Sequence, residues 1–230
     1  MPRSLPSAMA ASDPADPVNA GRSAADQVFH GILAALEARS LVPGQRLVEA
    51  DLATQFAVGR NSVREGLQRL VAEGLAEQPP HRSATIRRLS EQETLDVLDV
   101  AERMTGLLAR SAARGARDPA RAPALPAALA ALARAHEAND DAAFSDARRQ
   151  FYRALLRMSA NRELARLFPS IQMPIVHAQY RIPGLAALRL ADYGRIADAV
   201  LRGDAEAADA AGMAHVGRVR AALLARPETP

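Results

Sequence analysis

The chain has 230 residues, of which 49% are hydrophobic, so it can bury the core of one large domain or of two small ones. It contains no cysteine, which excludes disulfide bonds and thiolate metal sites and fits a reducing compartment. Its apolar runs are shorter than the roughly 18 residues that a membrane span needs. We therefore expect a cytoplasmic protein with no membrane partner.

The basic residues are unusual in kind. All 29 of them are arginine, and the formal net charge is +3. Arginine suits bidentate contacts to phosphate and guanine. However, the chain is also rich in alanine, and codon bias is the simpler explanation of the missing lysine. The positions of the arginines are therefore more informative than their number.

The N-terminal third of the chain contains signals for short helices. Residues 1–22 are rich in Ala, Ser and Pro and lack the apolar core of a signal peptide, which predicts a disordered tail. Helical spacing of apolar residues predicts a helix over 24–41, and a Pro-Gly turn follows at 42–47. A short helix is expected over 48–58 and a third from about Arg60 to Glu73, which Gly74 ends.

A hairpin is predicted next. The segments 75–78 and 84–89 alternate loosely between apolar and polar residues, and they flank an irregular tip with the sequence PPHRS. Three short helices followed by a hairpin predict a winged helix-turn-helix over residues 23–89.

Beyond Ser90 the sequence shows no strand pattern. Helical periodicity predicts an all-helical bundle over residues 90–226, so the expected fold class is mainly α. Asn161 and Asp204 are expected to be N-caps, and a loop with three prolines is expected from Gly115 to Pro126. The predicted helices are 91–114, Ala127–Ala138, Asp141–Ser159, Asn161–Ala178, Ala186–Arg202 and Ala205–Leu224.

The third helix has a pattern suited to reading DNA. One stripe of the helix is apolar and consists of Val63, Leu67, Leu70 and Val71. The adjoining flank is polar and consists of Arg60, Asn61, Arg64 and Gln68. Arg pairs with guanine or phosphate in a major groove, and Asn and Gln pair with adenine. The alternative is an ordinary solvated helix face. His81 and Arg82 at the hairpin tip favour double-stranded DNA, because a cationic wing suits an adjacent groove or phosphate.

The segment LVPGQRLVEADLATQFAVGRNSVREGLQRLVAEGL resembles the DNA-binding domain of the GntR family of bacterial transcriptional regulators. In that family, positions matching Arg60 and Arg64 contact DNA, and the wing tip enters the minor groove. The chain departs from the family pattern at Gly59, Ser62 and Ser83, where serine, proline and glycine are common. These departures bear on affinity or operator choice rather than on the fold.

The second domain resembles the FCD ligand-binding domain of the FadR subfamily. The segment FYRALLRMSAN sets the alignment, and the four positions that bind a divalent metal in many FCD domains then fall on Arg148, Tyr152, Tyr193 and His215. A guanidinium cannot coordinate a metal, and neutral Tyr is a poor ligand for Zn²⁺ or Ni²⁺. We therefore expect neither a metal nor another cofactor.

These four residues instead suggest a pocket for a small anionic metabolite, with Arg148 as the anchor. The alternatives are a hydrogen-bonded core position for His215 and an external charge for Arg148. Ala101 and Thr105 replace the Arg and Glu that are often found on the first FCD helix, which argues against the usual sugar-acid ligands of the family.

The resemblance implies a ligand-responsive regulator, expected to act as a repressor, that binds a palindromic operator as a homodimer. A second possibility is a ligand-blind regulator whose effector site has decayed to a dimerisation core. An enzyme using Tyr and His for acid–base chemistry is a third. The sequence does not favour it, because it offers no activated nucleophile, phosphate loop or metal cluster.

Overall fold

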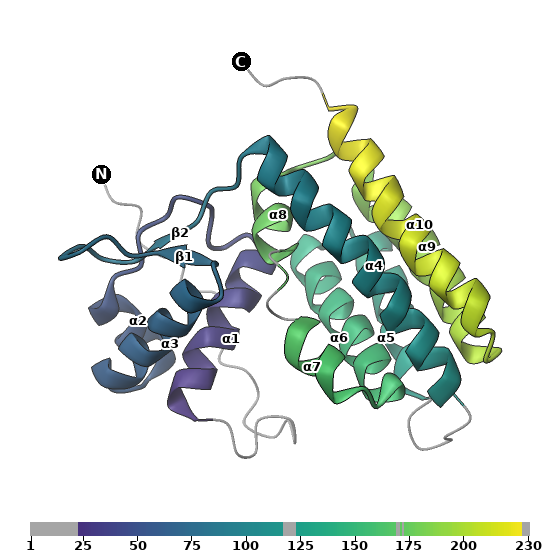
Figure 1. Cartoon of the computed structure of the whole chain (residues 1–230), viewed down its shortest axis with the longest axis horizontal. Coiled ribbons are helices and arrows are strands. Elements are labelled where there is room, and N and C mark those ends of the chain that lie inside the picture. The colour runs from purple at the N-terminus through teal and green to yellow at the C-terminus, as the bar shows by residue number, and fades with distance from the viewer. Residues whose placement is uncertain (1–22, 117–122, 169–170, 172, 227–230) are drawn as a thin grey trace. The chain divides into compact units, whose positions relative to one another are not determined.

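The computed structural model describes residues 23–116, 123–168, 171 and 173–226. It confirms a mainly α fold and separates into two compact units (Figure 1). The first unit contains the described residues up to Ser90 together with Pro174–Gln179, and the second contains the remaining described residues. The predicted tail lies outside the described residues.

The first unit is the predicted winged helix-turn-helix. Its helices are α1 (Ala24–Glu37), α2 (Glu49–Phe56) and α3 (Arg60–Ala72), and its strands are β1 (Ala76–Glu77) and β2 (Thr85–Ile86). The three helices enclose a core of fully buried apolar side chains that includes Val28, Phe29, Ile32, Leu36, Leu52, Val63, Leu67 and Leu70.

Local chemistry explains where these helices begin. The Ser23 side chain accepts a hydrogen bond from the Asp26 backbone, and the Asp26 side chain accepts one from the Ser23 backbone, which forms a capping box at the start of α1. Between α2 and α3 the chain turns through Ala57, which has the left-handed φ of 52°. Gly59 is the N-cap of α3.

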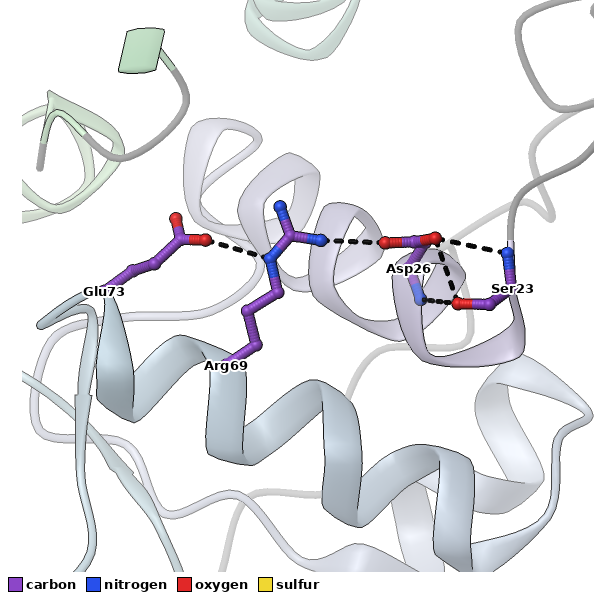
Figure 2. Close-up of polar contacts among 4 residues, drawn as sticks. All are labelled: Ser23, Asp26, Arg69 and Glu73. Carbon is purple, nitrogen blue, oxygen red and sulfur yellow. Dashed lines mark hydrogen bonds and ion pairs between the residues drawn. The ribbon is translucent and has the colours of Figure 1, made fainter. Parts of the chain in front are cut away.

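Arg69 of α3 joins this cap to the rest of the unit. It donates from Nη1 to Asp26 at 2.8 Å and from Nε to Glu73 at 2.9 Å (Figure 2). Its guanidinium also lies 3.8 Å from the centre of the Phe29 ring. One arginine thus ties the first turn of α1 to the C-terminal end of α3.

The buried stripe of α3 differs from the prediction at one position. Val63, Leu67 and Leu70 are buried as expected, but Val71 is only partly buried and Gly66 takes its place. A Cβ on Gly66 would lie 2.9 Å from the Cβ of Val28, so the absence of a side chain lets α3 pack closely against α1.

The wing is a short antiparallel pair in which Ala76 faces Ile86 and Glu77 faces Thr85. An isolated bridge from Arg46 to Thr85 adds a third segment beside β2. His81 adopts the left-handed φ of 60° at the tip. The backbone conformation for which glycine is suited therefore falls on His81, rather than on Ser83, the position that the family comparison predicted.

The predicted helix over Asn161–Ala178 is wrong. The structure instead contains α7 (Arg162–Leu167), which Asn161 caps as predicted, and a separate helix α8 (Met173–Gln179). Pro174 lies in the first turn of α8, where a backbone N–H has no acceptor within the helix, so proline is tolerated there. Pro169, which also favours a break, lies outside the described residues.

The α8 segment Pro174–Gln179 packs within the first unit. The Gln179 side chain accepts a hydrogen bond from the Leu89 backbone at 3.0 Å and donates one to the Leu89 carbonyl at 2.7 Å. Nε of Arg39 donates to the His177 carbonyl at 3.2 Å. A segment far along the chain thus holds Leu89, which follows β2 of the wing.

Helices form the second unit (Figure 1). They are α4 (Glu91–Gly115), α5 (Ala124–Glu137), α6 (Asp141–Ser159), α7, α9 (Leu185–Leu201) and α10 (Ala205–Leu224). The predicted loop at 115–126 is too long, because α5 already begins at Ala124 with Pro126 inside its first turn. Asp204 caps α10 as predicted.

The packing of α4 on α10 depends on small residues. A Cβ on Gly212 would lie 2.8 Å from the carbonyl oxygen of Thr105, and a Cβ on Gly106 would lie 2.7 Å from Cγ of Met213. The two helices therefore run side by side in close contact (Figure 1). Among the described residues, no helix combines the length and the apolar character needed to cross a bilayer.

Candidate nucleic-acid interface and effector cluster

The polar flank of α3 faces solvent. Arg60, Asn61, Arg64 and Gln68 are all exposed, and the buried stripe of the same helix faces the core. Arg60, Asn61 and Gln68 make no hydrogen bond to the part of the chain that the structure describes. The flank therefore offers three side chains that can reorient toward a ligand.

Arg64 differs from its neighbours because Glu49 of α2 holds it. Nε of Arg64 donates to Oε1 of Glu49 at 3.2 Å, and Nη2 donates to Oε2 at 2.9 Å. This hydrogen bonding, with the adjacent negative charge, raises the pKa of Arg64 above its ordinary value. The sequence-based prediction gave Glu49 no role.

The predicted wing residues, His81 and Arg82, are both exposed. The backbone of the tip is fixed by hydrogen bonds from Arg82 N to the Pro79 carbonyl at 3.1 Å and from Gln78 Nε2 to the Arg82 carbonyl at 3.3 Å. The tip thus presents two side chains capable of positive charge on an ordered turn.

In the second unit the structure brings together the four predicted effector residues. Tyr152 of α6 and Tyr193 of α9 have ring centres 5.9 Å apart, and the Tyr193 and His215 rings lie 4.9 Å apart. Arg148, one turn before Tyr152 on α6, is 7% exposed and acts electrostatically on both Tyr152 and His215. We call these residues, with Arg189 and Asp192, the effector cluster.

Asp192 organises one side of the effector cluster and is 1% exposed. Its Oδ2 lies 3.1 Å from Nδ1 of His215, and its Oδ1 accepts from Nη1 of Arg195 at 2.6 Å and from Nε of Arg218 at 2.9 Å. A carboxylate only accepts hydrogen bonds, so Nδ1 of His215 must carry the proton. In the neutral ring, Nε2 is then left as an acceptor.

Burial sets the protonation states of the cluster. Burial lowers the pKa of His215 below its ordinary value of 6.5, although the Asp192 hydrogen bond opposes this effect. For Asp192, burial raises the pKa, but hydrogen bonds from His215 and Arg218 outweigh it and lower the pKa below 3.8. Burial of the hydroxyl raises the pKa of Tyr152 well above its ordinary value of 10. The site therefore combines neutral His and Tyr with charged Arg and Asp.

Sequence reasoning missed Arg189, which is 6% exposed, and gave Asp192 no defined role. A signal for Arg189 was available, because it lies one helical turn before Tyr193 on α9 and thus on the same face. Like Arg148, Arg189 acts electrostatically on Tyr152 and His215. Two further arginines, Arg195 and Arg218, donate hydrogen bonds to Asp192.

The residues at the family's metal positions do not fit a divalent cation. Arg148 and Tyr152 supply a cation and a neutral phenol, neither of which is a suitable ligand for a divalent metal. Among the described residues there is no group of three or more His, Cys, Asp or Glu side chains able to hold a metal ion. The guanidinium of Arg148 carries a positive charge, which repels a cation.

Two protein families match the chain. Residues 24–86 match the bacterial regulatory proteins of the gntR family, and residues 96–218 match the FCD domain. The first range contains α1, α2, α3 and the wing, and the second contains every member of the effector cluster.

Individual relatives agree with these matches. An uncharacterized HTH-type transcriptional regulator of Mycobacterium tuberculosis is 30% identical over 73% of this chain and 76% of its own. A protein of Escherichia coli (strain K12), named for regulation of an L-lactate dehydrogenase operon, is 27% identical over 88% of this chain and 87% of its own. The structure of E. coli McbR/YncC covers 88% of this chain and 98% of its own, with a TM-score of 0.77 and 21% identity.

Proposed function

Because the chain belongs to the GntR family of bacterial regulatory proteins and carries an FCD domain, we propose that it is a ligand-responsive transcriptional regulator. Residues 23–89 form its DNA-binding domain, and residues 90–226 form its effector-binding and dimerisation domain. The matched families and relatives are transcriptional regulators rather than enzymes.

In this proposal the exposed flank of α3 enters the major groove. Arg60, Arg64, Asn61 and Gln68 contact base edges or phosphates, and the wing residues His81 and Arg82 contact the neighbouring backbone. The observation that supports it best is the separation of faces on α3, where the apolar stripe is buried and the polar flank is exposed. A homodimer then reads two half-sites of a palindromic operator.

The effector is proposed to be a small anion bound at the effector cluster. Two buried arginines, Arg148 and Arg189, lie near the Tyr152 hydroxyl, and guanidinium and phenol groups together can bind a carboxylate or phosphate through charge-assisted hydrogen bonds. Asp192 already accepts hydrogen bonds from Arg195 and Arg218. A carboxylate or phosphate between Arg148 and Tyr152 accepts a bidentate contact from the guanidinium and a hydrogen bond from the phenol.

The proposal is tested by melting the full chain with L-lactate, succinate or inorganic phosphate. We expect at least one of these anions to raise the melting temperature by mass action, and Arg148→Ala to abolish that rise while operator binding persists. The matched control is Arg149→Ala, on the same helix, which removes an arginine that pairs with Asp146 near the surface. A rise that survives Arg148→Ala would contradict the assignment of the anchor.

A ligand-blind regulator is the second candidate. It is favoured by the dense packing of Tyr193, which is 1% exposed and contacts the rings of Phe151, Tyr152 and His215. In that case neither the three anions nor Arg148→Ala changes operator affinity, and Arg148→Ala affects only stability.

A further inference from the structure

The contact between Glu49 and Arg64 is bidentate and joins two helices. Glu49 is the first residue of α2, and Arg64 lies in the second turn of α3, 15 residues further along the chain. Both carboxylate oxygens and two guanidinium nitrogens take part, at 3.2 and 2.9 Å. Such a pair fixes the plane of the guanidinium as well as its position.

The geometry leaves one edge of Arg64 available. A guanidinium has five N–H groups, and Glu49 accepts from Nε and from one hydrogen of Nη2. Nη1 makes no hydrogen bond to any described residue. The two outward hydrogens of Nη1 and Nη2 form the end-on fork that matches O6 and N7 of guanine.

Stability does not account for this pair. The Arg64 side chain is 59% exposed and the Glu49 side chain 30% exposed, and surface ion pairs of this kind add little to folding. Arg60, one turn earlier on the same exposed flank, makes no hydrogen bond to a described residue. Of the two arginines on this flank, only Arg64 is therefore held in a defined orientation before any ligand arrives.

We propose that Glu49 is a specificity-determining residue that holds the end-on fork of Arg64 toward the major groove, so that Arg64 reads guanine. This inference rests on the proposed contact of Arg64 with DNA. Glu49 acts through Arg64 and is a positioning residue. Holding the fork in advance reduces the side-chain entropy lost on binding. The carboxylate also opposes a swing of Arg64 to a phosphate, since Arg64 would have to leave its partner.

Under this proposal, the Glu49 carboxylate increases the preference for particular DNA sequences without increasing the affinity for DNA in general. Removing the carboxylate frees Arg64 to contact phosphates, which are present at every sequence, and it also removes a negative charge near DNA. Glu49→Gln is therefore expected to bind unrelated DNA as tightly as wild type or more tightly. It is expected to lose discrimination at the base pair that Arg64 reads.

The experiment uses the full chain and a duplex recovered by selection from random DNA. Binding is titrated by fluorescence anisotropy, at one fixed salt concentration, for that duplex, its single base-pair variants and a scrambled duplex. For Glu49→Gln we expect a roughly 10-fold loss of preference at one G·C pair in each half-site, since a bidentate pair with guanine provides discrimination of about that size. The melting temperature is expected to stay unchanged.

The matched control is Asp51→Asn, which removes the same charge two residues further along α2 from an exposed side chain. It is expected to alter binding to the scrambled duplex as Glu49→Gln does, while the preference for G·C remains. Equal preferences in Glu49→Gln and wild type at every position would overturn the inference, provided that Arg64→Ala loses binding. If Arg64→Ala itself binds like wild type, the proposed DNA contact of Arg64 fails as well.

Discussion

Arg69 of α3 donates a hydrogen bond at 2.8 Å to Asp26 in the first turn of α1, which fixes the helix carrying the proposed DNA-reading flank (Figure 2). Asp26 also completes the capping box with Ser23. The same carboxylate therefore supports both the start of α1 and the position of α3.

Asp26→Ala is expected to lower the free energy of unfolding by about 1 kcal/mol, mostly through loss of the cap, because the ion pair with Arg69 is partly exposed and screened. Urea-induced unfolding of the full chain measures this loss. The control is Glu65→Gln on α3, an exposed carboxylate with no hydrogen bond to a described residue. Equal losses in the two variants would contradict a structural role for Asp26.

The contribution of Asp26 also depends on pH. The Ser23 side-chain hydrogen bond, together with Arg69, lowers the pKa of Asp26 below 3.8. The stabilisation is therefore fully present above 3.8 and is lost as the pH falls through the lower folded pKa. The stability difference between wild type and Asp26→Ala should shrink as the pH is lowered below 3.8. A difference that stays constant with pH would show that the charge of Asp26 is irrelevant.

The crossing of α4 and α10 predicts opposite effects for two glycines of one helix. Gly212→Ala places a Cβ about 2.8 Å from the Thr105 carbonyl oxygen and is expected to cost about 1–3 kcal/mol of stability. Gly217→Ala, also on α10, meets nothing within 4 Å. It is expected to stabilise the helix by about 0.5–1 kcal/mol, because alanine is the better helix former. Unfolding measurements that give both variants the same sign would contradict this packing.

His215 predicts a pH dependence of stability in the second unit. Its pKa is lowered by burial, so between the folded pKa and the ordinary value of 6.5 the unfolded chain binds a proton that the folded chain does not. Stability should therefore fall as the pH decreases below 6.5. In His215→Gln this component should vanish, and melting temperatures taken at successive pH values measure the difference. Identical slopes for the two proteins would contradict a lowered pKa of His215 in the folded state.

Metal content provides another prediction. The effector cluster holds more arginines than carboxylates, so the purified protein is expected to contain no stoichiometric Zn, Ni or Mn. Elemental analysis measures this directly. About one metal per chain that disappears in His215→Ala would require a ligand set other than the one described for the cluster.

Helix caps and apolar periodicity explain which helices could be predicted from the sequence. The helices Asp141–Ser159 and Ala205–Leu224 have the predicted bounds, since Asp140 and Asp204 cap them and the apolar period is continuous. The break between α7 and α8 was missed because apolar residues continue through it. Periodicity alone does not show where one helix ends and the next begins.

In the candidate sites too, features within one helix could be predicted from the sequence, whereas contacts between helices could not. The polar flank of α3 follows from spacing within one helix, and the family alignment brings Tyr152, Tyr193 and His215 into one cluster. The contact of Glu49 with Arg64 joins different helices, and only the tertiary structure shows it. The same is true of the hydrogen bond between Asp192 and His215. Helical spacing predicts partners within an element, whereas partners across elements depend on how the helices pack.

The proposed reading of a defined DNA sequence by the exposed flank of α3 is tested by selecting bound duplexes from a random pool with the full chain. We expect enrichment of an inverted repeat whose half-sites lie about one helical turn apart. We also expect Arg64→Ala to lose preference for a G·C pair in each half-site. A pool without an enriched motif, or an unchanged motif for Arg64→Ala, would contradict this proposal.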